Sequence, residues 1–209
     1  MNRATSSADG ALSREERVEL LGQRGGTVWL TGLSGSGKTT LSTAVEKALV
    51  LDGYFVSRLD GDDVRQHLCR DLGFDRDARG ENVRRVAEVA RVLGGAGVIV
   101  LVALISPYAI DRQQARELHA EAGLPFIEVF LDTSVEVCRS RDPKGLYEKA
   151  GRGELHMLTG VDDPYEPPQH PELTVATEPL ERSVEAILGA LSSAGMLSRH
   201  PVGHATPNP

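Results

Sequence analysis

Short apolar runs alternate with amphipathic stretches along most of this chain. The apolar runs are rich in β-branched residues, which predicts buried strands at residues 26–32, 54–60, 98–107 and 125–133. Apolar residues at helical spacing predict helices at residues 38–53, 64–72, 80–97, 111–123, 134–142 and 182–197. Strands and helices in alternation predict an α/β fold, with three layers built around a mostly parallel central sheet.

The segments outside this alternation set the domain limits. Residues 1–24 read as an N-terminal tail followed by a short helix, because Ser13 and Glu16 form a capping-box pattern. Residues 25–197 form the main domain, and residues 198–209 are expected to be a disordered tail. Residues 142–171 are rich in Pro, Gly and charge and lack a clear period, so we expect a mobile lid there.

Composition excludes several classes of function. A net charge of −7 and an aromatic content of 4% argue against a nucleic-acid binder, which is normally basic and stacks bases on aromatic rings. The longest apolar run, residues 98–105, is too short to span a bilayer, and no secretory signal is visible. Two cysteines, Cys69 and Cys138, are too few for a disulfide framework and read as buried thiols. We therefore expect a cytoplasmic protein without a membrane partner.

The stretch TGLSGSGKTT carries the strongest chemical signal. Its pattern, glycine, four residues and then Gly-Lys-Thr, follows a predicted strand and precedes a predicted helix, which is the context that a phosphate-binding loop requires. Glycines let successive N–H groups point at phosphate oxygens, Lys38 suits the β- and γ-phosphates, and Thr39 suits Mg²⁺. We therefore expect ATP and Mg²⁺ as cofactors, held by the loop residues Gly32, Leu33, Ser34, Gly35, Ser36, Gly37, Lys38, Thr39 and Thr40.

Such a loop does not by itself name the reaction. The guanine-reading Asn-Lys-x-Asp stretch of GTPases is missing, and so is the LSGGQ signature of ABC-type ATPases. A small chain with dense polar groups after its strands favours a kinase for a small molecule over a switch or a motor. The identity of the phosphate acceptor stays open on these grounds.

Polar residues after the second predicted strand are candidates for catalysis. Asp60 and Asp62 lie two apart in a predicted loop, where one carboxylate can hold Mg²⁺ through water and the other can accept a hydroxyl proton. The alternative is a simple turn and helix cap. Arg65 suits an anionic acceptor, and Arg79 and Asn82 share one side of a helix. A solvated helix start is the alternative for that second pair.

In this order, the motifs resemble those of the adenylylsulfate (APS) kinases. They are GLSGSGKTT, LDGDDVR, LCRDLGFDRDARGENVRRVAEVA, ALISPY, IEVFLDTSVEVCRSRDPKGLYEKA and LTGVDDPYEPP, and the resemblance covers residues 26–195. It implies a P-loop NTPase-type fold and transfer of the ATP γ-phosphate to the 3′-hydroxyl of APS, giving PAPS and ADP in sulfate activation. It further implies a homodimer and leaves open an association with an ATP sulfurylase.

The resemblance also implies roles for single residues. Lys38, Asp60 near Mg²⁺ and Asp62 as the base would be catalytic, together with Ser106, whose counterpart in some family members can carry a phosphate. We favour direct transfer, with Ser106 as a pocket residue. Phe74 would stack on the APS adenine, and Arg141 would pack on the ATP adenine. The remaining substrate contacts implied are Asp62, Arg65, Arg79, Asn82, Ile105, Ser106, Lys144, Gly145, Leu146 and Leu158.

Two departures from the family pattern keep other functions open. Leu158 replaces the second aromatic residue of the adenine site, and Ala109 stands where many members have arginine. A related kinase for another small hydroxyl metabolite is therefore the alternative enzyme. A nucleotide-binding subunit without catalysis is the other alternative, although intact Lys38 and Asp62 oppose it.

Overall fold

The computed structural model describes residues 12–176 and 179–198. Its centre is one sheet of five strands in the order β2-β3-β1-β4-β5, with every strand pair parallel. The strands are β1 (Gly26–Thr31), β2 (Val56–Asp60), β3 (Ile99–Ala103), β4 (Phe126–Leu131) and β5 (Leu173–Val175). The α/β sheet and its first four strands were predicted correctly, whereas β5 was not predicted.

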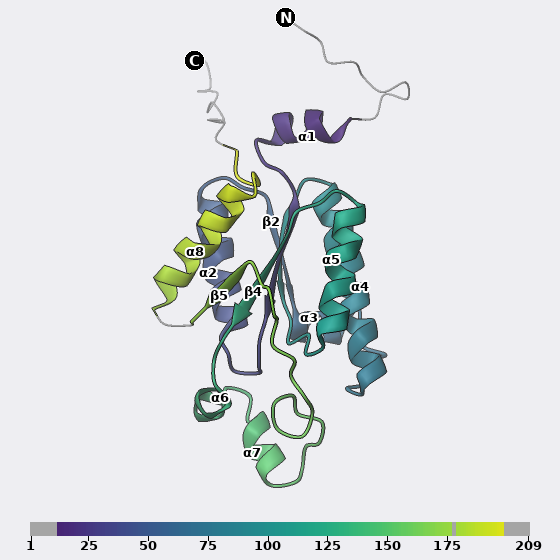
Figure 1. The fold of residues 1–209 in the computed structure, drawn as a ribbon, viewed down its shortest axis with the longest axis vertical. Helices are drawn as coiled ribbons and strands as arrows, with labels where there is room; N and C mark the ends of the chain where they lie inside the picture. The colour runs from purple at the N-terminus through teal and green to yellow at the C-terminus, as the bar shows by residue number, and fades with distance from the viewer. Residues whose placement is uncertain (1–11, 177–178, 199–209) are drawn as a thin grey trace, which may run out of the picture.

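Helices cover both faces of the sheet (Figure 1). The helices α2 (Lys38–Leu51) and α8 (Leu180–Ser193) lie on one face, and α4 (Arg76–Gly95) and α5 (Ala109–Glu121) lie on the other. Because neighbouring side chains of a strand point to opposite faces, Val28 and Leu30 join the core beneath α2 and α8, while Trp29 joins the core beneath α4 and α5. The result is the predicted three-layer fold.

Two helices begin earlier than their apolar periodicity predicts. Asp75 accepts a hydrogen bond from the amide of Ala78 and caps α4, which therefore starts at Arg76 rather than at residue 80. Likewise Asp60 caps α3 (Gly61–Gln66) by accepting from the amide of Asp62. The prediction of a helix over residues 64–72 and of a loop holding Asp62 was wrong, because the side chain of Asp60 starts the helix three residues sooner.

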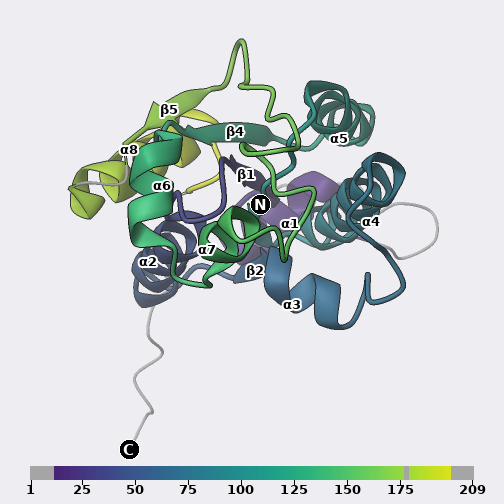
Figure 2. The same cartoon turned by 90° about the horizontal axis from the view of Figure 1, so that it is seen from below.

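The carboxyl ends of the parallel strands carry the loops that the sequence predicts to meet. In Figure 2, which is seen from that end, α3, α6 (Val135–Arg141) and α7 (Leu146–Gly151) surround the end of the sheet. The helix α7 lies within residues 142–171 and was not predicted. At the opposite end lies α1 (Arg14–Leu21), whose predicted capping box is present.

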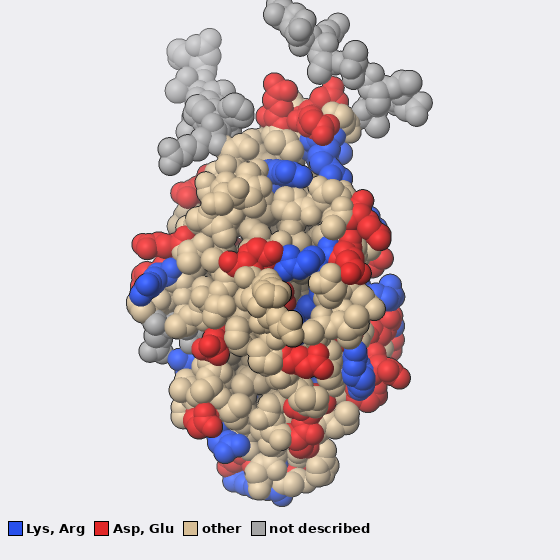
Figure 3. All heavy atoms as spheres, in the orientation of Figure 1, with Lys and Arg blue, Asp and Glu red and all other residues tan. Residues whose placement is uncertain are grey.

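Other properties of the described chain bear on the class of protein. Cys69 and Cys138 are free and buried, as predicted. None of the helices between residues 12 and 198, as far as they are described, is long and apolar enough to cross a membrane. On the face drawn in Figure 3, acidic and basic side chains are interspersed. The predicted disordered tail at residues 198–209 falls, apart from Ser198, outside the described residues, and so does most of the predicted tail at the N-terminus.

Candidate active site

The loop between β1 and α2 is built to receive an anion. Gly35 and Gly37 have φ angles of +77° and +98°, which residues with a side chain rarely adopt. Gly37 stands at the N-cap of α2 and no side chain caps this helix, so its first N–H groups are left for a ligand. A free helix N-terminus next to a glycine-rich loop favours phosphate.

Lys38 is folded back onto this loop. Its Nζ atom donates to the carbonyl oxygens of Gly32 and Leu33 at 2.9 and 2.7 Å, and lies 3.4 Å from Oγ of Ser36. Burial lowers the pKa of Lys38 from 10.5 to about 8. The ammonium group is therefore held inside the curve of the loop by neutral partners, which a phosphate can replace.

Thr39 and Asp60 bring oxygen atoms together beside the loop. Oγ1 of Thr39 donates to Oδ2 of Asp60 at 2.8 Å, and Arg58 approaches the same carboxylate oxygen at 3.2 Å. In the described part of the chain, no cluster of three or more His, Cys, Asp or Glu side chains could hold a metal. One hydroxyl and one carboxylate fit Mg²⁺, which usually takes one or two carboxylates and keeps waters and substrate phosphates as its other ligands.

Asp62 pairs with a residue from the predicted lid. It lies in the first turn of α3, where its carboxylate forms an ion pair with Lys144. Both side chains are about half exposed, at 59% and 48%. The structure thus brings together two residues that are 82 positions apart, one to which the resemblance assigns the role of base and one to which it assigns a substrate contact.

A second group of side chains lies around the start of α4. The guanidinium of Arg65 lies 4.3 Å from the ring centre of Phe74, and the residue Phe74 is 58% exposed. Arg79 is buried and donates to the carbonyl oxygens of Phe74 and Met157, at 2.8 and 2.6 Å. One guanidinium therefore joins the segment before α4 to the predicted lid.

Asn82 stands out among the buried polar groups. It lies one turn after Arg79 on α4 and is 5% exposed. Its Nδ2 is the one buried side-chain nitrogen or oxygen of the described residues without a hydrogen-bond partner. Since buried amides are nearly always paired, this unpaired donor makes Asn82 a candidate for a ligand contact.

The loop after β3 places Ile105 and Ser106 at the same end of the sheet. Ser106 is 3% exposed and has a φ of +40°. Its Oγ accepts from Nε1 of Trp29 and donates to Oγ1 of Thr31, each at 3.1 Å. The hydroxyl of Ser106 is thus turned inward and has two protein partners.

The other predicted contacts lie on the predicted lid, apart from Arg141, which lies just before it. Gly145 caps α7 with a φ of +65°, Leu146 is its first residue, and exposed Arg141 is in the last turn of α6. Leu158 is 6% exposed and packs with Leu33, Cys138 and Tyr147. Its side chain therefore belongs to an apolar cluster between the lid and the phosphate loop.

Some residues of the site were not singled out from the sequence. The hydroxyl of Tyr147 donates to the carbonyl of Ser34, which ties α7 to the phosphate loop, and Tyr108 donates to Asp163. The amide of Ala109 donates to the carboxylate of Glu166. Tyr108, Tyr147 and Glu166 all lie within motifs of the resemblance, so those motifs could have indicated them.

Comparisons with known proteins agree with this geometry. The family model described as "Adenylylsulphate kinase" matches residues 24–176. The adenylyl-sulfate kinase of Aeromonas salmonicida is 48% identical over 189 residues, covering 90% of this chain and 95% of that protein. A structure of the APS kinase of Mycobacterium tuberculosis in complex with AMPPNP and APS has a TM-score of 0.79 and 45% identity, covering 81% of this chain and 99% of that one. A hexameric APS kinase from Thiobacillus denitrificans has a TM-score of 0.63 and 33% identity, covering 84% of this chain and 30% of that one.

Proposed function

The chain belongs to the adenylylsulphate kinase family, and on that premise we propose that it transfers the γ-phosphate of ATP to the 3′-hydroxyl of adenylyl sulfate (APS). The products are ADP and PAPS. The observation that carries the acceptor assignment is the unpaired Nδ2 of Asn82, buried beside Arg79. A donor next to a cation suits an acceptor that combines a nucleobase or sugar edge with anionic oxygens.

The phosphate loop binds the triphosphate of ATP. The N–H groups at the start of α2 and the Nζ of Lys38 supply donors and positive charge at one place. When phosphate oxygens replace the carbonyls of Gly32 and Leu33, the ammonium of Lys38 gains a charged partner. Binding energy is thereby directed at the β- and γ-phosphates, where negative charge is redistributed during transfer.

Thr39 and Asp60 would hold Mg²⁺ at the edge of this loop. The bound cation would neutralise charge on the β- and γ-phosphate oxygens. Asp60 is kept in place by Arg58 and by the amide of Asp62. These contacts fix the carboxylate at the end of β2, so that it faces the hydroxyl of Thr39.

Asp62 is the residue that we assign as the base. Its carboxylate lies in the first turn of α3, two residues after the proposed Mg²⁺ ligand Asp60, and pairs with Lys144 of the predicted lid. It would accept the proton of the 3′-hydroxyl as the oxygen attacks the γ-phosphate. Lys144, which pairs with Asp62 here, would stabilise negative charge at the same point.

On the acceptor side, the ring of Phe74 offers an exposed face to adenine, while Arg65 covers part of it. Asn82 supplies an unpaired donor deeper in the site, and Arg79, which donates to Phe74 and Met157 and pairs with Asp163 at 3.5 Å, supplies positive charge beside it. The buried hydroxyl of Ser106, with two protein partners, supports direct transfer rather than a phosphorylated serine. Leu158 would contribute apolar contact without stacking.

The family premise also supports two proposals about partners. We infer a homodimer, and an ATP sulfurylase as the enzyme that supplies APS. Sedimentation of the purified protein and a coupled assay with an ATP sulfurylase test them separately.

The function is tested by turnover with a panel of acceptors. Purified protein with ATP and Mg²⁺ is expected to form PAPS and ADP in equal amounts from APS, and to leave gluconate and AMP unphosphorylated. Asp62→Asn is the control and is expected to abolish PAPS formation. Turnover of another hydroxyl compound but not of APS would overturn the proposal.

A further inference from the structure

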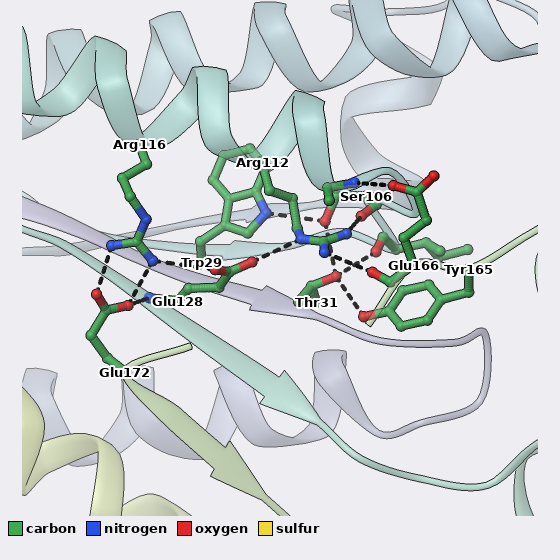
Figure 4. Close-up of polar contacts among 11 residues, drawn as sticks. Trp29, Thr31, Ser106, Arg112, Arg116, Glu128, Tyr165, Glu166 and Glu172 are labelled. Carbon is green, nitrogen blue, oxygen red and sulfur yellow. Dashed lines mark hydrogen bonds and ion pairs between the residues drawn. The ribbon is translucent and has the colours of Figure 1, made fainter. Parts of the chain in front are cut away.

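Arg112 joins three segments of the chain at a point below the acceptor loop (Figure 4). It lies on α5, and its side chain is 3% exposed. Its guanidinium donates to the carbonyl of Ser106 at 2.6 Å, to the carboxylate of Glu128 at 2.8 Å and to the carbonyl of Glu166 at 2.7 Å. A planar group with several fixed donors is suited to hold three acceptors in one geometry.

The first segment that Arg112 holds is the acceptor loop. Ser106 has a φ of +40°, in the left-handed region that residues with a side chain rarely adopt. Its hydroxyl is fixed by Trp29 and Thr31, and its carbonyl by Arg112. This unusual backbone conformation is therefore maintained by contacts on both sides of the residue.

The second segment is the end of the predicted lid that returns to the sheet. The amide of Glu166 donates to the carbonyl of Pro107, and its carboxylate accepts from the amide of Ala109. The hydroxyl of Tyr165 lies 3.0 Å from Oγ1 of Thr31, next to the phosphate loop. Residues 165–166 are thus attached both to the acceptor loop and to the end of β1.

The charges around Arg112 are balanced. Glu128 contacts Arg112 and Arg116, and Arg116 forms two hydrogen bonds with Glu172. Figure 4 shows this chain of ion pairs running along β4. A buried ion pair contributes little net stability compared with packed apolar side chains. Stability alone therefore gives no reason for an arginine at this position, whereas fixed geometry does.

We propose that Arg112 is a positioning residue for phosphoryl transfer. It fixes the returning end of the lid, residues 165–166, to the acceptor loop, residues 105–107, so that the moving part of the lid ends before Tyr165. The inference rests on the proposed function, since the acceptor loop is assigned through it. Arg112 acts through Ser106 and Glu166 and has no contact with substrate.

The test compares two Arg→Lys variants on the same helix and in the same ion-pair cluster. Arg112→Lys keeps the charge beside Glu128 but cannot reach three acceptors, and kcat/KM for APS is expected to fall about tenfold or more through misplacement. The Kd for ATP is expected to stay within about twofold, because Arg112 does not touch the phosphate loop. Arg116→Lys is the matched control: it loses contacts to Glu128 and Glu172, which lowers the Tm, but leaves kcat/KM for APS unchanged.

Hydrogen exchange gives a readout that needs no turnover. In Arg112→Lys the amides of Ala109 and Glu166 are expected to exchange faster together, and in Arg116→Lys they are not. Equal kinetics in wild type and Arg112→Lys, or unchanged exchange at both amides, would overturn the inference while leaving the kinase function intact. Failure of the wild type to use APS would instead overturn the proposed function. Hydrogen exchange at the amides of Ala109 and Glu166 would still show whether Arg112 fixes residues 165–166 to the acceptor loop.

A second variant covers the case in which Arg112→Lys does not fold. Glu166→Ala removes an exposed carboxylate from the amide of Ala109 without touching Arg112. It is expected to lower kcat/KM for APS and to speed exchange at Ala109, with a Tm close to that of the wild type. Unchanged kcat/KM for APS in this variant would also contradict the inference.

Discussion

Replacing Asn82 with leucine is expected to stabilise the free protein and to weaken the use of APS. Leucine branches at the same carbon as asparagine but has no polar atom to satisfy. In the free protein Nδ2 of Asn82 is buried without a partner, so the asparagine carries the cost of an unmade hydrogen bond. The same atom is the one that we assign to the acceptor, so stability and activity are predicted to change in opposite directions.

The magnitudes follow from the surroundings of Asn82. An unsatisfied buried donor costs about 1–3 kcal/mol, which Asn82→Leu removes. For a domain of this size, each 1 kcal/mol shifts the Tm by about 2–4 °C, so a rise of at least about 2 °C is expected without ligand. A lost neutral hydrogen bond of about 0.5–1.5 kcal/mol to the acceptor raises the KM for APS roughly twofold to tenfold.

Thermal unfolding without ligand and steady-state kinetics with varied APS measure the two effects. Thr27→Val is the control, because Thr27 is fully buried but hydrogen-bonded to His119 at 2.9 Å. It is expected to lower the Tm and to leave the KM for APS unchanged. A lower Tm in Asn82→Leu together with an unchanged KM would refute the reasoning, since Nδ2 would then have a structural partner and no role in the acceptor site.

Three further predictions follow from the site and the core. Burial lowers the pKa of Lys38 to about 8, and the phosphates of ATP bind its protonated form, so the Kd for ATP should rise by up to about tenfold for each pH unit above 8. Calorimetry from neutral to alkaline pH measures this Kd, and a Kd that does not change with pH contradicts the prediction. Burial also lowers the pKa of His119 below 6.5, so as the pH falls the unfolded chain is protonated at this histidine before the folded protein is. The stability contributed by neutral His119 is therefore complete above pH 6.5 and declines below it, and denaturant titration of His119→Gln should show a weaker dependence on acid pH. Ser106→Ala should lower the Tm, because it removes two buried hydrogen bonds, yet keep PAPS formation; loss of about a thousandfold in kcat would instead indicate a phosphorylated serine.

The sheet and the phosphate loop could be predicted because their signals are local. The apolar runs of β1 and β3 and the glycines before Lys38 each lie within one short stretch of sequence. By contrast, β5 is three residues long and follows an irregular segment, so no period marks it. The start of α3 was missed because Asp60 and Asp62 were interpreted as catalytic residues in a loop, whereas the alternative that this cluster caps a helix is correct for Asp60.

Side-chain contacts between different segments of the chain could not be predicted from the sequence either. Arg112 meets Ser106, Glu128 and Glu166, whose positions differ from its own by 6, 16 and 54 residues. Only the parallel order of the strands and the return of the lid bring these partners together. Asn82 was a candidate from the sequence, but only the packing of α4 showed that its amide lacks a partner.

A single-turnover experiment with γ-labelled ATP and APS tests the central claim most directly. Rapid quenching is expected to show label passing from ATP to the 3′-position of the product, with none on the protein at any time, and Asp62→Asn is expected to show no transfer. Label that appears first on the protein would contradict direct transfer. Label that is released only as inorganic phosphate would contradict the assignment of APS as the acceptor.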